Sequence, residues 1–196
     1  MEEDLKNSSE TKKNILIGAT GSVAAVRTIP IARGFIEAGY NVKIAVTESA
    51  KNFISEESPI CEVYDEQSHW SQWKNNHQVL HINLRKWADI LLIAPLDANT
   101  LAKMANGLCD NLLTCVVRAW DLSKPMVLAP AMNTMMWENP FTNEHLNKVR
   151  EVYNAHIVGP IAKTLACQET GIGAISDTQE IIRCCISLLS NNYIIQ

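Results

Sequence analysis

Short apolar runs alternate with longer stretches of helical spacing along most of this chain. The helical stretches are Ser22–Gly39, Asp97–Ala105, Asp110–Trp120, Asn143–Tyr153 and Thr178–Leu189. The apolar runs predict strands at Asn14–Gly18, Asn41–Val46, Val79–Ile82, Asp89–Ala94, Met126–Ala129 and His156–Val158. Strands that alternate with helices indicate βαβ units, and so the pattern predicts one α/β domain with a three-layer, doubly wound parallel sheet of the Rossmann or flavodoxin type.

Three segments interrupt this regular pattern. Pro30 lies inside the first helical stretch, so that helix is kinked there or begins near Thr28. Residues 55–77 are polar and predict an irregular excursion with a short helix. Residues 165–175 contain two glycines and predict a loop.

Composition and charge exclude several classes of protein. With 47% hydrophobic and 19% charged residues, the 196-residue chain can build a core and is not globally disordered. A net charge of −4 without a Lys/Arg cluster argues against nucleic-acid or membrane-surface binding, and no apolar run reaches the length of a membrane span. Seven charges in residues 1–13 exclude a signal peptide, which favours a disordered leader, a domain over residues 14–196 and a cytoplasmic location.

Cysteines and most histidines carry no motif. No C-x-x-C pair and no metal-ligand spacing is present, so we expect reduced cysteines, mostly small buried hydrophobes, and no metal. Cys167 is the exception, for reasons given below. We expect surface or loop positions for His69, His77, His145 and His156, and positions covering the core or an interface for Trp70 and Trp73.

Small polar residues follow four of the predicted strands. Ser22 follows a Gly-x-x-Gly turn, which matches neither the dinucleotide fingerprint nor the P-loop. The other strand ends carry Thr47-Glu48-Ser49, Pro95–Thr100 and Pro130–Asn133. Each is explained by a helix N-cap on its own, but at one sheet edge together they favour a planar ligand that bears a phosphate.

The segment Pro130–Trp137 reads PAMNTMMW and is unusual in its methionine content. Its three methionines and tryptophan form either part of the core or a soft wall suited to a flat ring. Asn133 within it is either a helix cap or an amide that binds a carboxylate.

The same segment fits P-x-M-N-x-x-M-W, the signature of the flavoprotein cysteine decarboxylases. VLHINLRKWAD (79–89), APLDANTLAK (94–103) and GATGSVAA (18–25) resemble the other sequence blocks of that family, and the resemblance covers about residues 13–190. It implies FMN as cofactor, a homotrimer with the flavin near a subunit interface, and a place in the branch that decarboxylates 4′-phosphopantothenoylcysteine to 4′-phosphopantetheine in coenzyme A biosynthesis.

The resemblance also implies roles for individual residues. The catalytic set is His81, Cys167, Asn133 and Met136, and the substrate contacts are Asn133, Ala166 and Ile175. The flavin contacts are Gly21, Ser22, Val23, Thr47, Ser49, Asp97, Ala98, Asn99, Thr100, Ala131 and Met132.

We hypothesise a mechanism that leaves no net redox change. The substrate thiol is oxidised to a thioaldehyde while FMN holds the electron pair, which allows carbon dioxide to leave, and the product is then reduced again. His81 assists thiol deprotonation, because an imidazole titrates near neutral pH. Cys167 returns a proton to the intermediate.

The flap around Cys167 departs from the pattern of the resembled family. Gln168 stands where that family has glycine and Ile175 where it often has methionine, which predicts altered flap closure and turnover. Three alternatives therefore stay open: a weakly catalytic regulator that binds a protein phosphatase, a flavin decarboxylase of another cysteine-bearing acid, and, more distantly, a nicotinamide-binding domain with Glu48 on a ribose.

Overall fold

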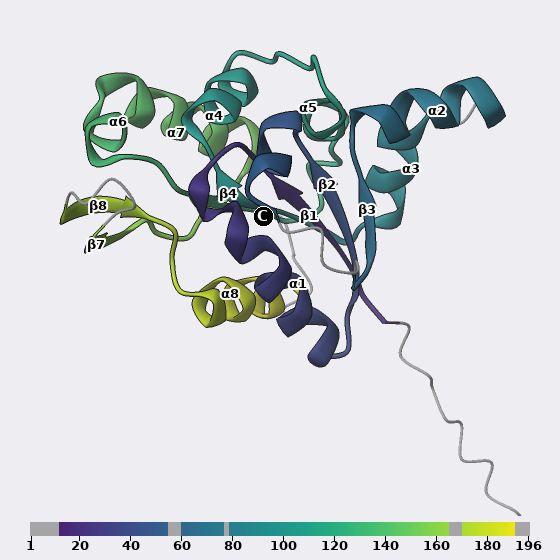
Figure 1. Ribbon diagram of the computed structural model, residues 1–196, viewed down its shortest axis with the longest axis horizontal. Helices are drawn as coiled ribbons and strands as arrows, with labels where there is room; N and C mark the ends of the chain where they lie inside the picture. Colours follow the sequence, from purple (N-terminus) through teal and green to yellow (C-terminus); the bar gives the residue numbers. More distant parts are fainter. Residues whose placement is uncertain (1–11, 55–59, 77–78, 165–169, 191–196) are drawn as a thin grey trace, which may run out of the picture.

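The fold is built on a six-stranded parallel sheet. A computed structural model describes residues 12–54, 60–76, 79–164 and 170–190. The strand order is β3-β2-β1-β4-β5-β6 (Figure 1). After β3 the chain returns to the centre of the sheet and places β4 next to β1, so the direction of strand addition reverses between these two strands. This confirms the predicted doubly wound sheet. The strands are β1 (Asn14–Ala19), β2 (Asn41–Val46), β3 (Glu62–Tyr64), β4 (Ile90–Leu96), β5 (Met126–Pro130) and β6 (His156–Ile157).

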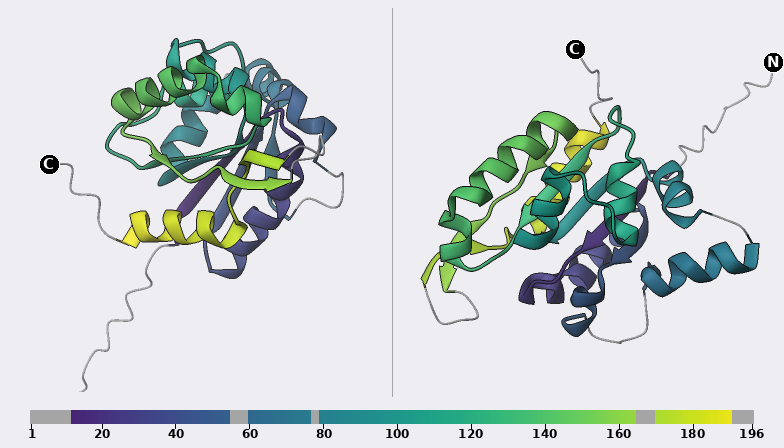
Figure 2. Two further views of the ribbon diagram at one scale, coloured as in Figure 1. Left: turned by 90° about the vertical axis from the view of Figure 1, so that its left-hand side faces the viewer. Right: turned by 90° about the horizontal axis from the view of Figure 1, so that it is seen from above.

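Helices cover both faces of the sheet and complete the three layers (Figures 1 and 2). One face packs against α1 (Thr28–Glu37) and α8 (Thr178–Ser190). The other face packs against α3 (Leu80–Trp87), α4 (Ala98–Ala105), α5 (Leu112–Arg118) and α7 (Pro140–Tyr153). The remaining elements are η1 (Val23–Arg27), η2 (Glu48–Asn52), α2 (Glu66–Asn76), α6 (Thr134–Glu138) and an antiparallel hairpin of β7 (Ile161–Thr164) and β8 (Thr170–Ala174).

Burial on both faces explains why the central strands read as continuous apolar runs. In β1, Ile15 and Ile17 belong to the cluster under α1 and α8, whereas Leu16 belongs to the cluster under the opposite helices. All three side chains are fully buried. Because alternate residues enter different cores, a polar residue at any of these positions would be buried.

The predicted strand at Val79–Ile82 is wrong, because this segment begins helix α3. Leu80 and Leu84 lie one helical turn apart and are both buried, which places the apolar side of a helix on the sheet. The third strand is instead β3, within the polar segment predicted to be irregular. Its first two residues are exposed at the sheet edge, so no apolar run marks it.

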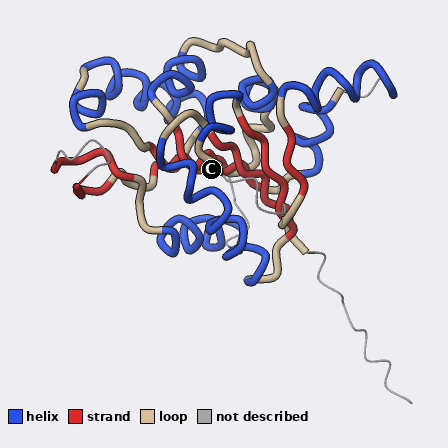
Figure 3. The backbone as a smooth tube through the Cα atoms, viewed as in Figure 1, coloured by secondary structure: helices blue, strands red, loops and turns tan. Residues whose placement is uncertain are grey.

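Two other segments differ from, or refine, the sequence prediction. The helix predicted from Ser22 begins at Thr28 after a separate 3₁₀ turn, which is one of the two arrangements that Pro30 allowed. Pro30 sits in the first turn of α1, where its missing N–H removes no helical hydrogen bond. The predicted loop at residues 165–175 contains strand β8 (Figure 3).

Several expectations about single residues can be compared with the structure. Cys185 is buried and Cys184 packs against the core as predicted, but Cys109 is exposed and does not fit a buried hydrophobe. Trp70 and Trp73 are about half exposed and do not cover the core. Most of the predicted leader lies outside the described residues. Within the described part of the chain, none of the helices has both the length and the apolar character needed to cross a membrane.

Candidate active site

Thr20 joins the ends of the two central strands at the carboxyl edge of the sheet. Its backbone N–H and its hydroxyl both donate to the carbonyl of Pro95, over 3.2 and 2.9 Å. The same hydroxyl oxygen accepts from the backbone N–H of Asp97 at 2.7 Å. Thr20 is fully buried. The loops that follow β1 and β4 are therefore fixed against each other at the point where ligands bind in such sheets.

Gly21 lies where three strand ends meet. A Cβ atom on Gly21 would lie 2.4 Å from Oγ of Ser49 and 3.3 Å from a carboxylate oxygen of Asp97. The hydroxyls of Ser49 and Thr47 are 3.2 Å apart, after β2. Only glycine allows these loops to approach so closely.

Three of the predicted N-caps are present in the structure. Ser22 Oγ accepts from the N–H of Ala24, Asp97 Oδ1 from Thr100, and Asn133 Oδ1 from Met135. Glu48, which the nicotinamide alternative places on a ribose, is exposed and pairs with Lys51 at 2.9 Å. The polar groups of the edge are thus neutral hydroxyls and amides, with Asp97 occupied as a cap.

A cavity of about 450 Å³ opens beside this edge. Its volume lies within the range of about 300–1,000 Å³ that is usual for small-molecule sites. The predicted flavin and substrate contacts in its wall are Ser22, Val23, Ala131, Met132, Asn133 and Ile175. The predicted contacts Thr47, Ser49 and Asp97–Thr100 are not in this wall; Ser49 and Asp97 lie next to Gly21, at the strand ends described above.

The volume and the lining of the cavity suit FMN. Ala131, Met132 and Ile175 give it an apolar wall suited to a flat ring. Arg27 and Lys163 bring two positive charges to its rim, which suits a ligand with a phosphate group. Sequence analysis did not identify either cation, because neither lies in a motif and only the fold brings them together.

The hairpin closes one side of the cavity. The N–H of Met132 donates to the carbonyl of Gly173 at 3.0 Å. Gly173 has a φ of +155°, and a Cβ there would lie 2.2 Å from the carbonyl oxygen of Met132. Strand β8 therefore lies directly on the segment that leads into α6. The predicted flap residues Ala166 and Cys167 fall between β7 and β8 in the sequence, outside the described residues.

Helix α6 places its methionines on the surface. Met135 and Met136 are 70% and 48% exposed, and none of the α6 residues is buried. Core packing is therefore the wrong explanation for these two side chains, although Met132 is buried in the cavity wall. The exposed methionines leave an apolar surface next to Asn133.

His81 opens into a different pocket, of about 440 Å³, and does not line the cavity that contains Asn133. It lies on α3, on the β3 side of the sheet, whereas α6 and the hairpin lie on the opposite side (Figure 1). The structure thus separates two residues that the sequence assigned to one site. The pocket is lined by Glu66, His69, Trp70, Trp73, Val79, His81, Cys109, Asp110, Asn111 and Cys115.

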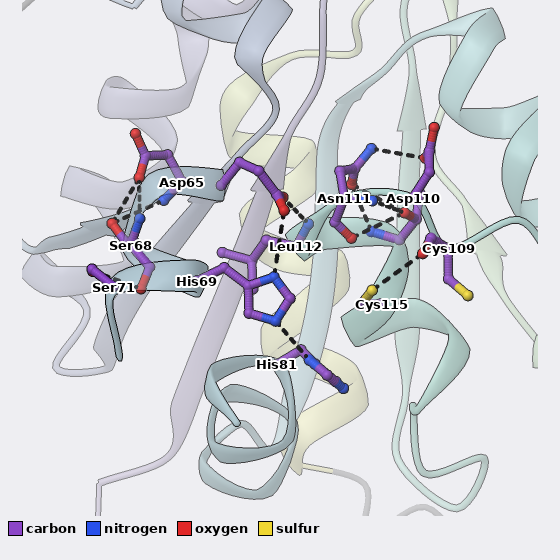
Figure 4. A network of polar contacts seen from close by, with 12 residues as sticks. Asp65, Ser68, His69, Ser71, His81, Cys109, Asp110, Asn111, Leu112 and Cys115 are labelled. Carbon is purple, nitrogen blue, oxygen red and sulfur yellow. Dashed lines mark hydrogen bonds and ion pairs between the residues drawn. The ribbon is translucent and has the colours of Figure 1, made fainter. Parts of the chain in front are cut away.

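Sequence analysis placed His69 wrongly, at the surface or in a loop, whereas it lies on α2 and lines the pocket of His81. Its side chain is 12% exposed, and its Nε2 lies 3.0 Å from Nδ1 of His81 (Figure 4). Burial, and then the proximity of His69, lower the pKa of His81 below its ordinary value. The spacing of Glu66 and His69 could have indicated a pair on one helix face, but the contact with His81 depends on how α2 packs on α3.

The known proteins that this chain resembles in sequence include flavoproteins and decarboxylases. The family described as Flavoprotein matches residues 3–190. A phosphopantothenoylcysteine decarboxylase of Oryza sativa is 49% identical over 87% of this chain and 78% of its own length. The enzyme of that name in Mus musculus is 42% identical over 96% and 93%. The chain also matches a probable thymidylate synthase of Schizosaccharomyces pombe with 45% identity, but spans only 29% of that protein.

Solved structures agree with these relatives. A PPC decarboxylase mutant complexed with pantothenoylaminoethenethiol has a TM-score of 0.88 and 44% identity, and the match covers 92% of this chain and all of the other. The FMN binding protein AtHal3 has a TM-score of 0.85 and 44% identity, with 92% and 98% covered. The chain therefore belongs to the flavoprotein family, as a homologue of the phosphopantothenoylcysteine decarboxylases.

Proposed function

We propose that this protein is an FMN-dependent decarboxylase that converts 4′-phosphopantothenoylcysteine to 4′-phosphopantetheine in coenzyme A biosynthesis. The observation that carries this proposal is a cavity lined by Asn133, by an apolar wall and by two cations. The names of the relatives support the same substrate and reaction.

Different residues around the cavity would bind different parts of the flavin and the substrate. Bound FMN would accept an electron pair from the substrate thiol and return it after carbon dioxide has left. The hydroxyls near Gly21 hold the flavin, and the apolar wall excludes water. The amide of Asn133 binds the substrate carboxylate until it leaves, while Arg27 and Lys163 attract the substrate phosphate.

We infer that the working form is a ring of identical subunits, a cytoplasmic homotrimer. Two of the exposed apolar regions adjoin the two cavities. Val26 lines the first cavity and Met135 and Met136 follow its Asn133 on α6, whereas Trp70 and Trp73 line the pocket of His81. Contact between two different patches on successive subunits generates a ring when the rotation between the subunits closes. Such a contact would supply His81 of one subunit to the Asn133 of its neighbour, which a single chain does not achieve.

The first test is the colour and activity of the purified protein. We expect a yellow protein that releases carbon dioxide from phosphopantothenoylcysteine, whereas His81→Asn should keep its flavin and lose turnover by about 10²-fold or more, the usual contribution of a general base. A colourless protein that takes up no added FMN would contradict the proposal, and unchanged turnover in His81→Asn would remove the role of His81.

The second test concerns Cys167, which we propose as the proton donor to the intermediate. Cys167→Ser should still release carbon dioxide but accumulate the oxidised ene-thiol product, because the hydroxyl is a far weaker acid than the thiol. Mass spectrometry of the bound product measures this. Normal release of phosphopantetheine by the variant would count against the assignment.

A further inference from the structure

We propose that Glu66 and His69 act as positioning residues that keep the proton of His81 on Nδ1 and so leave Nε2 as the base. The inference rests on the proposed function, since it explains how His81 serves the thiol of the substrate. Three contacts in series carry it, and they connect α2, α3 and the start of α5.

The series begins at a fixed carboxylate. Glu66 accepts the backbone N–H of Leu112, the first residue of α5, at 2.7 Å. Its other oxygen lies 3.6 Å from Nδ1 of His69. Nε2 of His69 lies 3.0 Å from Nδ1 of His81. Glu66 and His69 are thereby presented by α2, and His81 is presented by α3.

The positions of the protons on the two imidazole rings follow from which atoms can donate and which can accept a hydrogen bond. The carboxylate of Glu66 lies 3.6 Å from Nδ1 of His69, within ion-pair distance but too far for a hydrogen bond. A negative charge at this distance attracts an N–H and repels a lone pair, so it favours the proton of His69 on Nδ1. In neutral His69 the second nitrogen, Nε2, is then an acceptor, and Nδ1 of His81 has to be the donor in the 3.0 Å contact. A neutral His81 with its proton on Nδ1 carries the lone pair on Nε2, the nitrogen that points away from His69 in Figure 4.

The proton transfer to His81 is balanced within this set. The thiol proton moves to Nε2 of His81, which leaves a thiolate on the substrate and an imidazolium on His81. The imidazolium keeps its Nδ1–H bond to His69, and the carboxylate of Glu66 lies behind His69 to offset the charge. The same logic of an acid that orients an imidazole operates in hydrolase triads.

The surroundings keep this arrangement in place. His69 stacks at a tilt against Trp70, with ring centroids 5.4 Å apart, and meets His81 edge to face at 5.1 Å. Burial lowers the pKa of His81, which favours the neutral base at pH 7. The other titratable groups in the described wall of the pocket are Cys109, Asp110, which pairs with Lys103, and Cys115, whose pKa burial raises to about 11.

Two variants of His69 separate positioning from structure. In His69→Gln, a side-chain carbonyl remains to accept from Nδ1 of His81, whereas His69→Phe keeps a ring but offers no acceptor. Gln67→Ala, at an exposed position of the same helix, is the control for general damage to α2. Two-bond proton–nitrogen correlation spectra of the flavin-loaded, histidine-labelled protein report which nitrogen of His81 carries the proton.

We expect the wild type, His69→Gln and the control to show the proton of His81 on Nδ1, and His69→Phe to shift it to Nε2. In the same series kcat should fall about tenfold in His69→Phe, less than the 10²–10⁴ lost with a general base itself. His69→Gln should recover most of that loss, with flavin content unchanged throughout.

Two results would overturn the inference. One is a wild-type His81 that already carries its proton on Nε2, and the other is equal effects of the Gln and Phe variants on proton position and kcat. Failure of the proposed function has a different signature, namely a wild-type protein without flavin or decarboxylation. The proton position would then still be measurable.

Discussion

At the scale of the residue, the carboxyl edge of the sheet requires glycine at two positions and polar helix caps at others. Gly21 has no Cβ, and this lets the loops after β1 and β2 come together. Ser22 and Asn133 could be identified as caps from the sequence, because short polar side chains between a strand and a helix commonly accept a hydrogen bond from the first turn of that helix. The requirement for glycine at 173 could not, because it arises from the distant backbone of Met132.

We predict that Gly21→Ala loses flavin. The added carbon meets both Oγ and Cβ of Ser49, at 2.4 and 2.7 Å, so the loop has to move. Overpacking of this kind costs about 1–3 kcal/mol, and we expect flavin affinity to fall about tenfold or more, measured by fluorescence titration. Gly34→Ala is the matched control, because its new carbon meets only the flexible end of Ile182. Equal flavin binding by both variants would contradict this view of Gly21.

At the scale of the element, α2 illustrates why part of the site could not be predicted. Its sequence is polar, and its side chains find partners on α3 and α5 that no local pattern reveals. The strands of the core were predicted well because burial on both faces gives a strong signal. Val79–Ile82 was misassigned because a short apolar run fits a strand as well as the start of a helix.

Asp65, at the N-terminus of α2, should make the stability of the fold decrease at low pH. Burial alone would raise the pKa of Asp65, but Lys51 and the N–H and hydroxyl of Ser68 together lower it to about 2. In the unfolded chain the pKa of aspartate is about 3.9. The stabilisation by ionised Asp65 is therefore present above about pH 4 and is lost as the pH falls through about 2.

We therefore expect Asp65→Asn to unfold more easily than the wild type at pH 7 and to lose this disadvantage near pH 2. At pH 7 the free energy of unfolding of Asp65→Ala should be lower than that of Asp65→Asn by about 0.5–2 kcal/mol, because the alanine variant also loses the helix cap. Denaturant titrations across this pH range measure both effects. A difference between wild type and Asp65→Asn that stays constant with pH would show that the charge plays no part.

At the scale of the whole molecule, Asn133 and His81 line separate cavities of one chain, as the two halves of a shared site would in the proposed ring. The sequence placed His81 and Asn133 together because both belong to the resembled motifs. Motifs along a chain do not report how far apart they lie in the fold, so only the three-dimensional arrangement showed that the two residues open into separate cavities.

Mixing two inactive variants tests the proposed ring. His81→Asn and Asn133→Asp should each be inactive alone, the second because a carboxylate repels the substrate carboxylate while it still caps α6. After unfolding and refolding together in equal amounts, random rings should regain about a quarter of the wild-type sites. Activity that stays at the level of the separate variants would place both residues of a site in one subunit.

The separation of His81 from Asn133 also has a consequence for inheritance. In the proposed trimeric ring, a subunit that is defective in both groups would disable the pocket it shares with each neighbour, so one defective copy would inactivate two of the three active sites. An allele carrying both lesions would act as a partial dominant, whereas alleles carrying one lesion each would compensate for one another in the same cell.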